Sequence, residues 1–207
     1  MLKAIRYYIE QSWLLIVSAF FFGLLLAVTN AAWSGKIENN KTEKLSGLMK
    51  SLITDAEKFE IVLKDTQIDL GKGKKTKTDI YKALTAEKSD AGFCFNAEGT
   101  GFAGKIELVI AIDKTCTKVV GFNVLTSNET PGFGDKIARS FYNDQYKGAP
   151  VGLLNLSKSG DDKKIDDEII AISGATVSST GVVNIFNNYL QQIKTHLLEK
   201  GLIQNVQ

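Results

Sequence analysis

A cluster of hydroxyl side chains marks the point where an apolar run gives way to a long amphipathic segment. It reads Ser173-Gly174-Ala175-Thr176-Val177-Ser178-Ser179-Thr180. The first N–H groups of a helix have no partner within the helix, and the macrodipole places partial positive charge at that end. A helix that begins here could therefore hold a phosphate group. The alternative is that Ser173 caps the helix and the other hydroxyls are solvated.

The residues on either side of this cluster predict the elements that would position it. Ile169, Ile170 and Ile172 indicate the end of a buried strand. The apolar side chains after the cluster recur at helical spacing, so one face of the helix would pack on the domain and fix its first turn. These side chains are Val182, Phe186, Tyr189, Ile193 and Leu197.

Two other segments resemble loops that bind ligands. Asn128-Glu129-Thr130-Pro131-Gly132-Phe133-Gly134-Asp135-Lys136-Ile137 contains a turn signal at its proline and glycine, and Glu129 could simply accept backbone hydrogen bonds there. Gly99-Thr100-Gly101-Phe102-Ala103-Gly104 satisfies the dinucleotide-binding glycine pattern. That motif requires a helix to follow, whereas residues 106–112 predict a strand. We therefore interpret residues 99–104 as a turn.

The hydroxyl cluster at 173–180 and the segment at 128–137 together resemble a known family. Ser173-Gly174-Ala175-Thr176 is similar to the flavinylation motif of the G subunit of the Rnf complex and the C subunit of the sodium-translocating NADH:quinone oxidoreductase. Glu129-Thr130-Pro131-Gly132 resembles the family loop beside the bound flavin. The resemblance implies that FMN is joined to Thr176 by a phosphoester. It also implies a surrounding site without catalytic or metal-binding residues, formed by Ser173, Gly174, Ala175, Val177, Ser178, Glu129, Thr130, Pro131 and Gly132.

Two features of the cluster bear on that modification. The family pattern usually has an aspartate six residues before the acceptor threonine, and Ile170 stands there in this chain. If the flavin transferase reads that aspartate, modification would be slower or incomplete. Ser178, Ser179 and Thr180 are competing hydroxyls that helical geometry alone does not exclude. Only the resemblance selects Thr176.

The N-terminal part of the chain predicts a membrane helix. Residues 12–32 carry no charge and are long enough to cross a bilayer, and aromatic residues flank them. A cleaved signal peptide is the alternative, with a weak cleavage candidate at Thr29-Asn30-Ala31. We expect a cytoplasmic N-terminus at 1–11, a transmembrane helix at 12–33, a connecting helical segment at 34–58 and an extracytoplasmic domain at 59–207. The orientation follows the family, because basic residues flank the span on both sides.

The rest of the pattern predicts an α+β fold with an antiparallel sheet and flanking helices. We expect a short helix over 42–54, a strand over 59–63, a flexible polar segment over 71–78 and a helix over 135–142. The remaining expected strands lie at 93–95, 106–112, 119–125 and 151–156, the first three of them in an antiparallel meander.

Composition excludes several functions. The chain has 25 basic and 23 acidic residues, which argues against nucleic acid as a partner. Its one histidine, His196, and the lack of metal-ligand spacings leave little for a hydrolase. Cys94 and Cys116 could pair or be two buried thiols. The acidic residues at 161–168 lack the spacing of a calcium loop.

The resemblance implies an electron-relay subunit of an ion-translocating ferredoxin:NAD oxidoreductase in the cell membrane. Its partners would be an iron–sulfur-bearing membrane subunit, a second flavin subunit and the flavin transferase. The alternatives are the C subunit of the quinone reductase and an anchored binding or assembly module without flavin.

Overall fold

The computed structural model describes residues 2–71 and 73–204, and the chain divides into two compact units, Met1–Lys44 and Leu45–Gln207. Residues 1, 72 and 205–207, which fall within the predicted N-terminus, polar segment and C-terminal domain, lie outside the described residues. The elements in chain order are α1 (Leu2–Leu52), β1 (Lys58–Asp69), β2 (Lys75–Leu84), β3 (Asp90–Thr100), β4 (Lys105–Asp113), β5 (Val119–Ser127), η1 (Gly134–Ala138), α2 (Ser140–Asn143), η2 (Asp144–Tyr146), β6 (Asn155–Ser157), β7 (Glu168–Ile170) and α3 (Thr176–Glu199).

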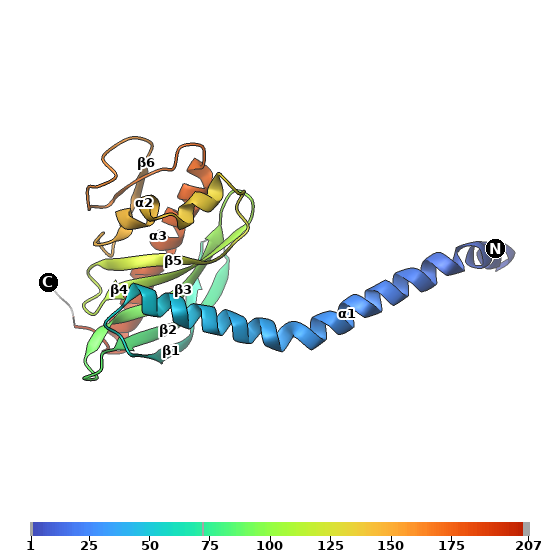
Figure 1. The fold of residues 1–207 in the computed structure, drawn as a ribbon, viewed down its shortest axis with the longest axis horizontal. Helices are drawn as coiled ribbons and strands as arrows, with labels where there is room; N and C mark the ends of the chain where they lie inside the picture. Colours follow the sequence, from blue (N-terminus) through green and yellow to red (C-terminus); the bar gives the residue numbers. More distant parts are fainter. Residues whose placement is uncertain (1, 72, 205–207) are drawn as a thin grey trace. The chain divides into compact units, whose positions relative to one another are not determined.

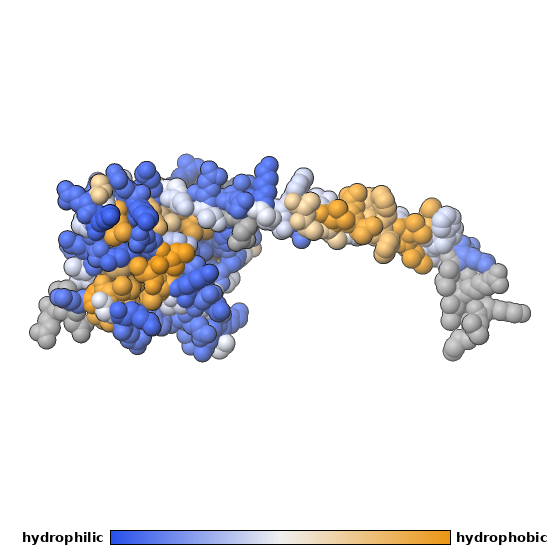
Figure 2. Space-filling model, turned by 90° about the horizontal axis from the view of Figure 1, so that it is seen from below, coloured by the Kyte–Doolittle hydropathy of each residue, from blue (hydrophilic) through white to orange (hydrophobic). Residues whose placement is uncertain are grey.

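The first unit contains the part of helix α1 that precedes Leu45, and α1 includes a stretch long and apolar enough to span a membrane. Figure 2 shows its apolar side chains as a continuous band. Two hydroxyls within the band donate to carbonyls of the preceding turn, from Ser18 to Leu15 at 3.0 Å and from Thr29 to Leu25 at 2.7 Å. Such bonds satisfy polar side chains where no water is available. The separate helix expected over 42–54 is wrong, because α1 runs without interruption to Leu52.

The second unit is built on a five-stranded antiparallel sheet of order β1-β2-β3-β4-β5 (Figure 1). The predicted antiparallel meander is confirmed as β3 to β5, and the α+β class with it. The strand expected over 59–63 extends to Asp69. The polar segment is wrong from Lys75 onward, where β2 begins: Lys75 and Lys77 are exposed, Thr78 is buried, and the backbone pairs with β1.

Two hydrophobic clusters cover the two faces of the sheet. The larger contains Phe93 and Phe95 of β3 together with the apolar side of α3, including Phe186. The smaller contains Cys94 of the same strand and Met49 near the end of α1. Successive side chains of a strand point to opposite faces, so this alternation fixes which residues face α3. Helix α3 is thereby held along the sheet, and its first turn is fixed in place.

The helix expected over 135–142 is instead a series of three short helical segments, η1, α2 and η2. The series breaks at Arg139, whose backbone is extended, with φ −84° and ψ 147°. Ile137 and Tyr142 are both buried, although five residues of continuous helix would place them about 140° apart. The break turns both side chains toward the same core.

The strand expected over 151–156 is also wrong in extent, because pairing begins only at Asn155. The backbone of Leu154 bonds to a side chain of α3 instead of a neighbouring strand. Its N–H donates to Asn187 Oδ1 at 2.8 Å, and its carbonyl accepts from Asn187 Nδ2 at 2.9 Å. These bonds let Val151 and Leu154 bury their side chains from an irregular segment.

Candidate functional site

The candidate site is formed around the first turn of α3. Gly174 has φ +79°, a left-handed conformation that glycine adopts without strain, and Ala175 follows as the N-cap. No side chain caps the helix. The interpretation of Ser173 as the cap is therefore wrong, since the chain reverses at Gly174 and the helix begins two residues later than such a cap requires. The N–H groups of the first turn remain available to an anion.

The hydroxyls of the cluster differ sharply in their partners. Ser178 is buried and donates a short hydrogen bond to Glu129 Oε2. Ser179 is buried, donates to Ala175 O at 3.1 Å and accepts from Ile172 N–H at 3.0 Å. Thr180 donates to Thr176 O at 2.8 Å. The hypothesis that these hydroxyls are simply solvated is thus wrong for Ser178 and Ser179.

Thr176 is the first residue of α3 and is partly exposed. It lines a cavity of about 410 Å³. Seven of the residues predicted for the site line this cavity: Glu129, Thr130, Gly174, Ala175, Thr176, Val177 and Ser178. The structure thus brings the two predicted loops together. Pro131 does not line the cavity, whereas Gly132 and Ser173 line a different one.

Three lining residues were not predicted: Phe102, Phe133 and Gly134. Phe102 belongs to the glycine-rich turn between β3 and β4, and Phe133 follows the predicted Pro131-Gly132 turn. The position of Phe133 directly after the turn motif could have identified it as a site residue. Phe102 had a weaker signal, as an aromatic residue in an otherwise small and polar turn.

Glu129 joins the three segments around the cavity. Its side chain is buried, with an exposed fraction of 7% for the residue. Oε1 accepts from the backbone N–H of Ala103 at 3.0 Å, and Oε2 accepts from Ser178 Oγ. Glu129 does accept a backbone hydrogen bond, but the donor, Ala103, lies in another loop and not in the turn of Glu129, where the alternative interpretation had expected it. The carboxylate therefore links the turn after β3 to the first turn of α3.

The loop that carries Glu129 makes a tight turn at Thr130. Phe133 N–H donates to Thr130 O at 3.2 Å, with Pro131 and Gly132 at the two central positions. Gly132 has φ +80°, as a type II turn requires at its third residue. The turn directs the chain back so that Phe133 lines the cavity beside Gly174.

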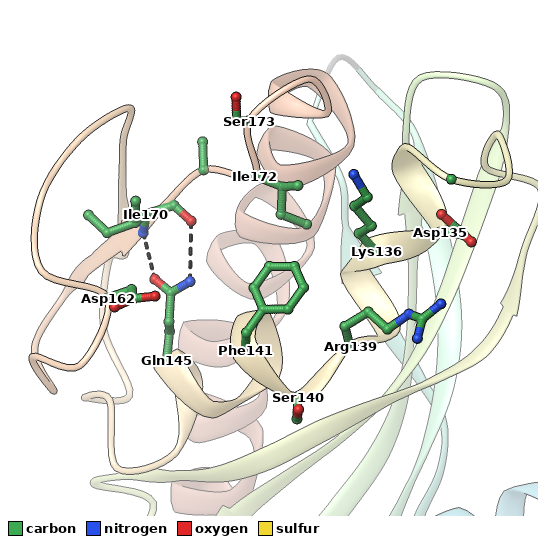
Figure 3. Close-up of a pocket in the computed structure, with 12 residues that line it drawn as sticks. Asp135, Lys136, Arg139, Ser140, Phe141, Gln145, Asp162, Ile170, Ile172 and Ser173 are labelled. Atoms are coloured by element: carbon green, nitrogen blue, oxygen red, sulfur yellow. Dashed lines mark hydrogen bonds between the residues drawn. The ribbon is translucent and has the colours of Figure 1, made fainter.

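A second cavity, of about 670 Å³, adjoins the other side of these loops (Figure 3). Phe141 and Ile172 point toward each other within it, and Lys136 extends from η1 at one side. Gln145 fixes the strand edge, since Ile170 N–H donates to Gln145 Oε1 at 2.7 Å and Gln145 Nε2 donates to Ile170 O at 3.3 Å. Ile170, at the family's aspartate position, therefore borders this second cavity.

The two cysteines lie in different clusters on opposite faces of the sheet, and both thiols are free. Burial raises the pKa of Cys94 to about 12. Burial and the nearby Asp113 raise the pKa of Cys116 to about 12. Of the two options for the cysteines, the structure supports buried thiols. Across residues 2–71 and 73–204, no group of three or more His, Cys, Asp or Glu side chains is placed to bind a metal ion.

Comparison of the sequence with known protein families points to the same site. Residues 101–191 match the family of the FMN-binding domain, a range that begins in the glycine-rich turn and ends within α3. It includes all three segments around the smaller cavity. This stretch of the chain is therefore similar to an FMN-binding domain, in agreement with the resemblance found in the sequence.

Individual relatives extend the similarity to most of the chain. It is 29% identical over 181 residues to the G subunit of the proton-translocating ferredoxin:NAD(+) oxidoreductase complex of Clostridium ljungdahlii, covering 87% of this chain and 89% of the relative. It is 28% identical to the G subunit of the Na(+)-translocating ferredoxin:NAD(+) oxidoreductase complex of Acetobacterium woodii. That alignment covers 80% of this chain and 82% of the relative. The crystal structure of Shewanella oneidensis NqrC has the same fold, with a TM-score of 0.56 and 21% identity. The superposition covers 70% of this chain and 73% of NqrC.

Proposed function

We propose that this chain carries FMN as a phosphoester on Thr176 and relays electrons within a membrane-bound, ion-translocating ferredoxin:NAD oxidoreductase. The observation that carries the proposal is the contrast among the hydroxyls of the first turn of α3. Thr176 and Ser178 both line the cavity, but Ser178, like Ser179 and Thr180, donates its hydroxyl hydrogen to an acceptor of the protein. The cavity, with Phe102 and Phe133 at its lining, suits a planar apolar ring system.

The chain supplies the binding environment, and FMN supplies the redox chemistry. The free N–H groups of Thr176, Val177 and Ser178 suit the remaining charge of a phosphodiester, because they are the first three donors of α3. Ser179 N–H is already bonded to Ala175 O at 3.0 Å. A covalent bond would also prevent loss of the cofactor from an open site.

The relatives support the other subunits of such a complex as partners. The G subunits of two ferredoxin:NAD(+) oxidoreductase complexes align with this chain along most of its length. We propose that it lies in the cell membrane, with α1 as its anchor and the domain on the extracytoplasmic side; the apolar stretch of α1 supports the anchor. Its partners would be an iron–sulfur-bearing subunit, a second flavin subunit and the flavin transferase. The named relatives differ in the translocated ion, so this assignment is to ion translocation in general.

A second candidate is the C subunit of a sodium-translocating NADH:quinone oxidoreductase. It is favoured by the fold shared with NqrC. Copurification distinguishes the two candidates, because each complex has its own neighbouring subunits.

The experiment that tests the proposal is intact mass of the full chain, coexpressed with a flavin transferase and extracted from membranes. The wild-type chain should gain the mass of FMN less water. Thr176→Ala should abolish the gain, whereas Ser173→Ala, which removes an exposed hydroxyl of the same motif, should keep it. An unmodified wild-type chain would favour the flavin-free binding or assembly module.

A further inference from the structure

Two exposed phenylalanines flank the cavity that contains Thr176. Phe102 has an exposed fraction of 70% and Phe133 one of 58%, and both line the cavity. They come from separate loops, the turn after β3 and the loop after β5. A large aromatic side chain left in water forgoes the free energy of burial. Two of them at one cavity indicate a ligand or partner that covers them.

The turn that carries Phe102 is held firmly. Gly101 N–H donates to Gly104 O at 2.7 Å, and Ala103 N–H donates to Glu129 Oε1 at 3.0 Å. A Cβ atom at Gly101 would lie 2.3 Å from Glu129 Oε1, so the carboxylate needs the glycine. Phe102 therefore projects from a turn whose backbone is fixed on both sides of it.

The same turn packs directly on α3. A Cβ atom at Gly181 would lie 2.7 Å from Thr100 O and 3.1 Å from Gly101 Cα. Backbone thus meets backbone at the second turn of the helix whose first residue is Thr176. This close approach requires glycine at position 181, and a Cβ atom at Gly99 of the turn, which is not part of a dinucleotide motif, would likewise collide with Ile185 of α3. It fixes the position of Phe102 relative to Thr176.

We propose that Phe102 and Phe133 are binding residues for the isoalloxazine ring of the flavin on Thr176, and that Glu129 positions Phe102. This inference rests on the proposed function and adds the residues that contact the ring. Aromatic rings contact flat aromatic ligands favourably through stacking or edge contacts. Phe133 is itself placed by the Pro131-Gly132 turn, and Lys136 Nζ lies 5.9 Å from its ring centroid. The site thus has one aromatic side chain from the turn after β3 and one from the loop after β5.

The test uses the flavinylated full chain in detergent and measures collisional quenching of flavin fluorescence by iodide. We compare wild type, Phe102→Ala, Phe133→Ala and the control Phe141→Ala. Phe141 is similarly exposed, at 52%, but lines the other cavity. Each site variant should raise the quenching constant of the modified chains, because removal of the phenyl group exposes the flavin ring to iodide. Phe141→Ala should leave it unchanged.

Two further variants separate contact from folding. Phe102→Trp should restore the protection of the ring, because it keeps an aromatic face at the same position. Glu129→Ala, which removes the acceptor of the Ala103 N–H, should raise the quenching constant while the far-UV circular dichroism stays that of wild type, as expected for a positioning residue. Equal quenching constants in wild type, Phe102→Ala and Phe133→Ala would overturn the inference and assign both side chains to a partner protein. Absence of flavin from wild type would instead overturn the proposed function.

Discussion

Ser178 Oγ donates a short hydrogen bond to Glu129 Oε2, although the two residues are 49 positions apart in the sequence. The bond joins the turn-forming loop after β5 to the first turn of α3. Its partners are both buried, so water does not compete for either group. It removes one hydroxyl from the set that could carry a phosphate and places a carboxylate beside the cavity of Thr176.

Replacing Glu129 with Gln should make the flavin easier to reduce. Reduction adds negative charge to the flavin, and loss of a nearby carboxylate charge removes a repulsion that opposes it. We expect the midpoint potential to rise by about 30 mV, equivalent to about 1.4 kcal/mol for two electrons. Spectroelectrochemical titration of the modified chain measures this shift. Glu87→Gln, an exposed carboxylate outside the cavity, is the control and should leave the potential unchanged.

Replacing Gly101 with Ala should destabilise the domain, because the added Cβ would lie 2.3 Å from Glu129 Oε1. We expect the free energy of unfolding to fall by about 1–3 kcal/mol, as for other overpacked sites. Urea unfolding followed by far-UV circular dichroism measures the loss. Gly152→Ala is the matched control, since nothing lies within 4 Å of its added Cβ. Equal stability of the two variants would show that the turn moves away from Glu129 at no cost.

Asn187→Ala should also lower the free energy of unfolding. The variant leaves the N–H and the carbonyl of Leu154 without their side-chain partners, bonded at 2.8 Å and 2.9 Å in the wild type. The expected loss is about 1–3 kcal/mol, the cost of unsatisfied buried polar groups. Asn188→Ala, at the next position of α3, is the control. A loss below that of the control would mean that water replaces both bonds.

The two cysteines should be unreactive in the folded domain. Their pKa values are raised to about 12, in both cases first by burial, so the thiolate that attacks a thiol reagent is scarce at neutral pH. The unfolded thiols ionise near the ordinary pKa of 9.0. Stability from these groups is therefore complete below about pH 9 and is lost as the pH rises toward 12. Thiol titration with and without denaturant checks this, and fast reaction of the native domain at pH 8 would contradict it.

The sequence could predict those features that depend on local pattern. The α+β class and the meander of β3 to β5 follow from runs of apolar residues between turns. The two predicted loops of the site, at 128–137 and 173–180, could be recognised from their sequence motifs. The structure places residues from both around one cavity, because α3 lies on the sheet that carries the loop of Glu129.

Other features depend on contacts distant in sequence and could not be read locally. Strand β2 is rich in lysine and threonine, and its pairing with β1 decides its structure. The break at Arg139 reflects the shared core of Ile137 and Tyr142. Phe102 becomes part of the site only through Glu129, whose hydrogen bond to Ala103 N–H spans 26 positions. No periodicity in the sequence encodes that bond.

The most direct test of the central claim is to locate the flavin on the chain. Fragmentation mass spectrometry of the peptide that contains residues 173–180, from protein coexpressed with the flavin transferase, assigns the modified hydroxyl. We predict that FMN lies on Thr176 alone, since Ser178, Ser179 and Thr180 donate to acceptors within the domain. FMN on any of those three residues or on Ser173, or an unmodified peptide, would contradict the account.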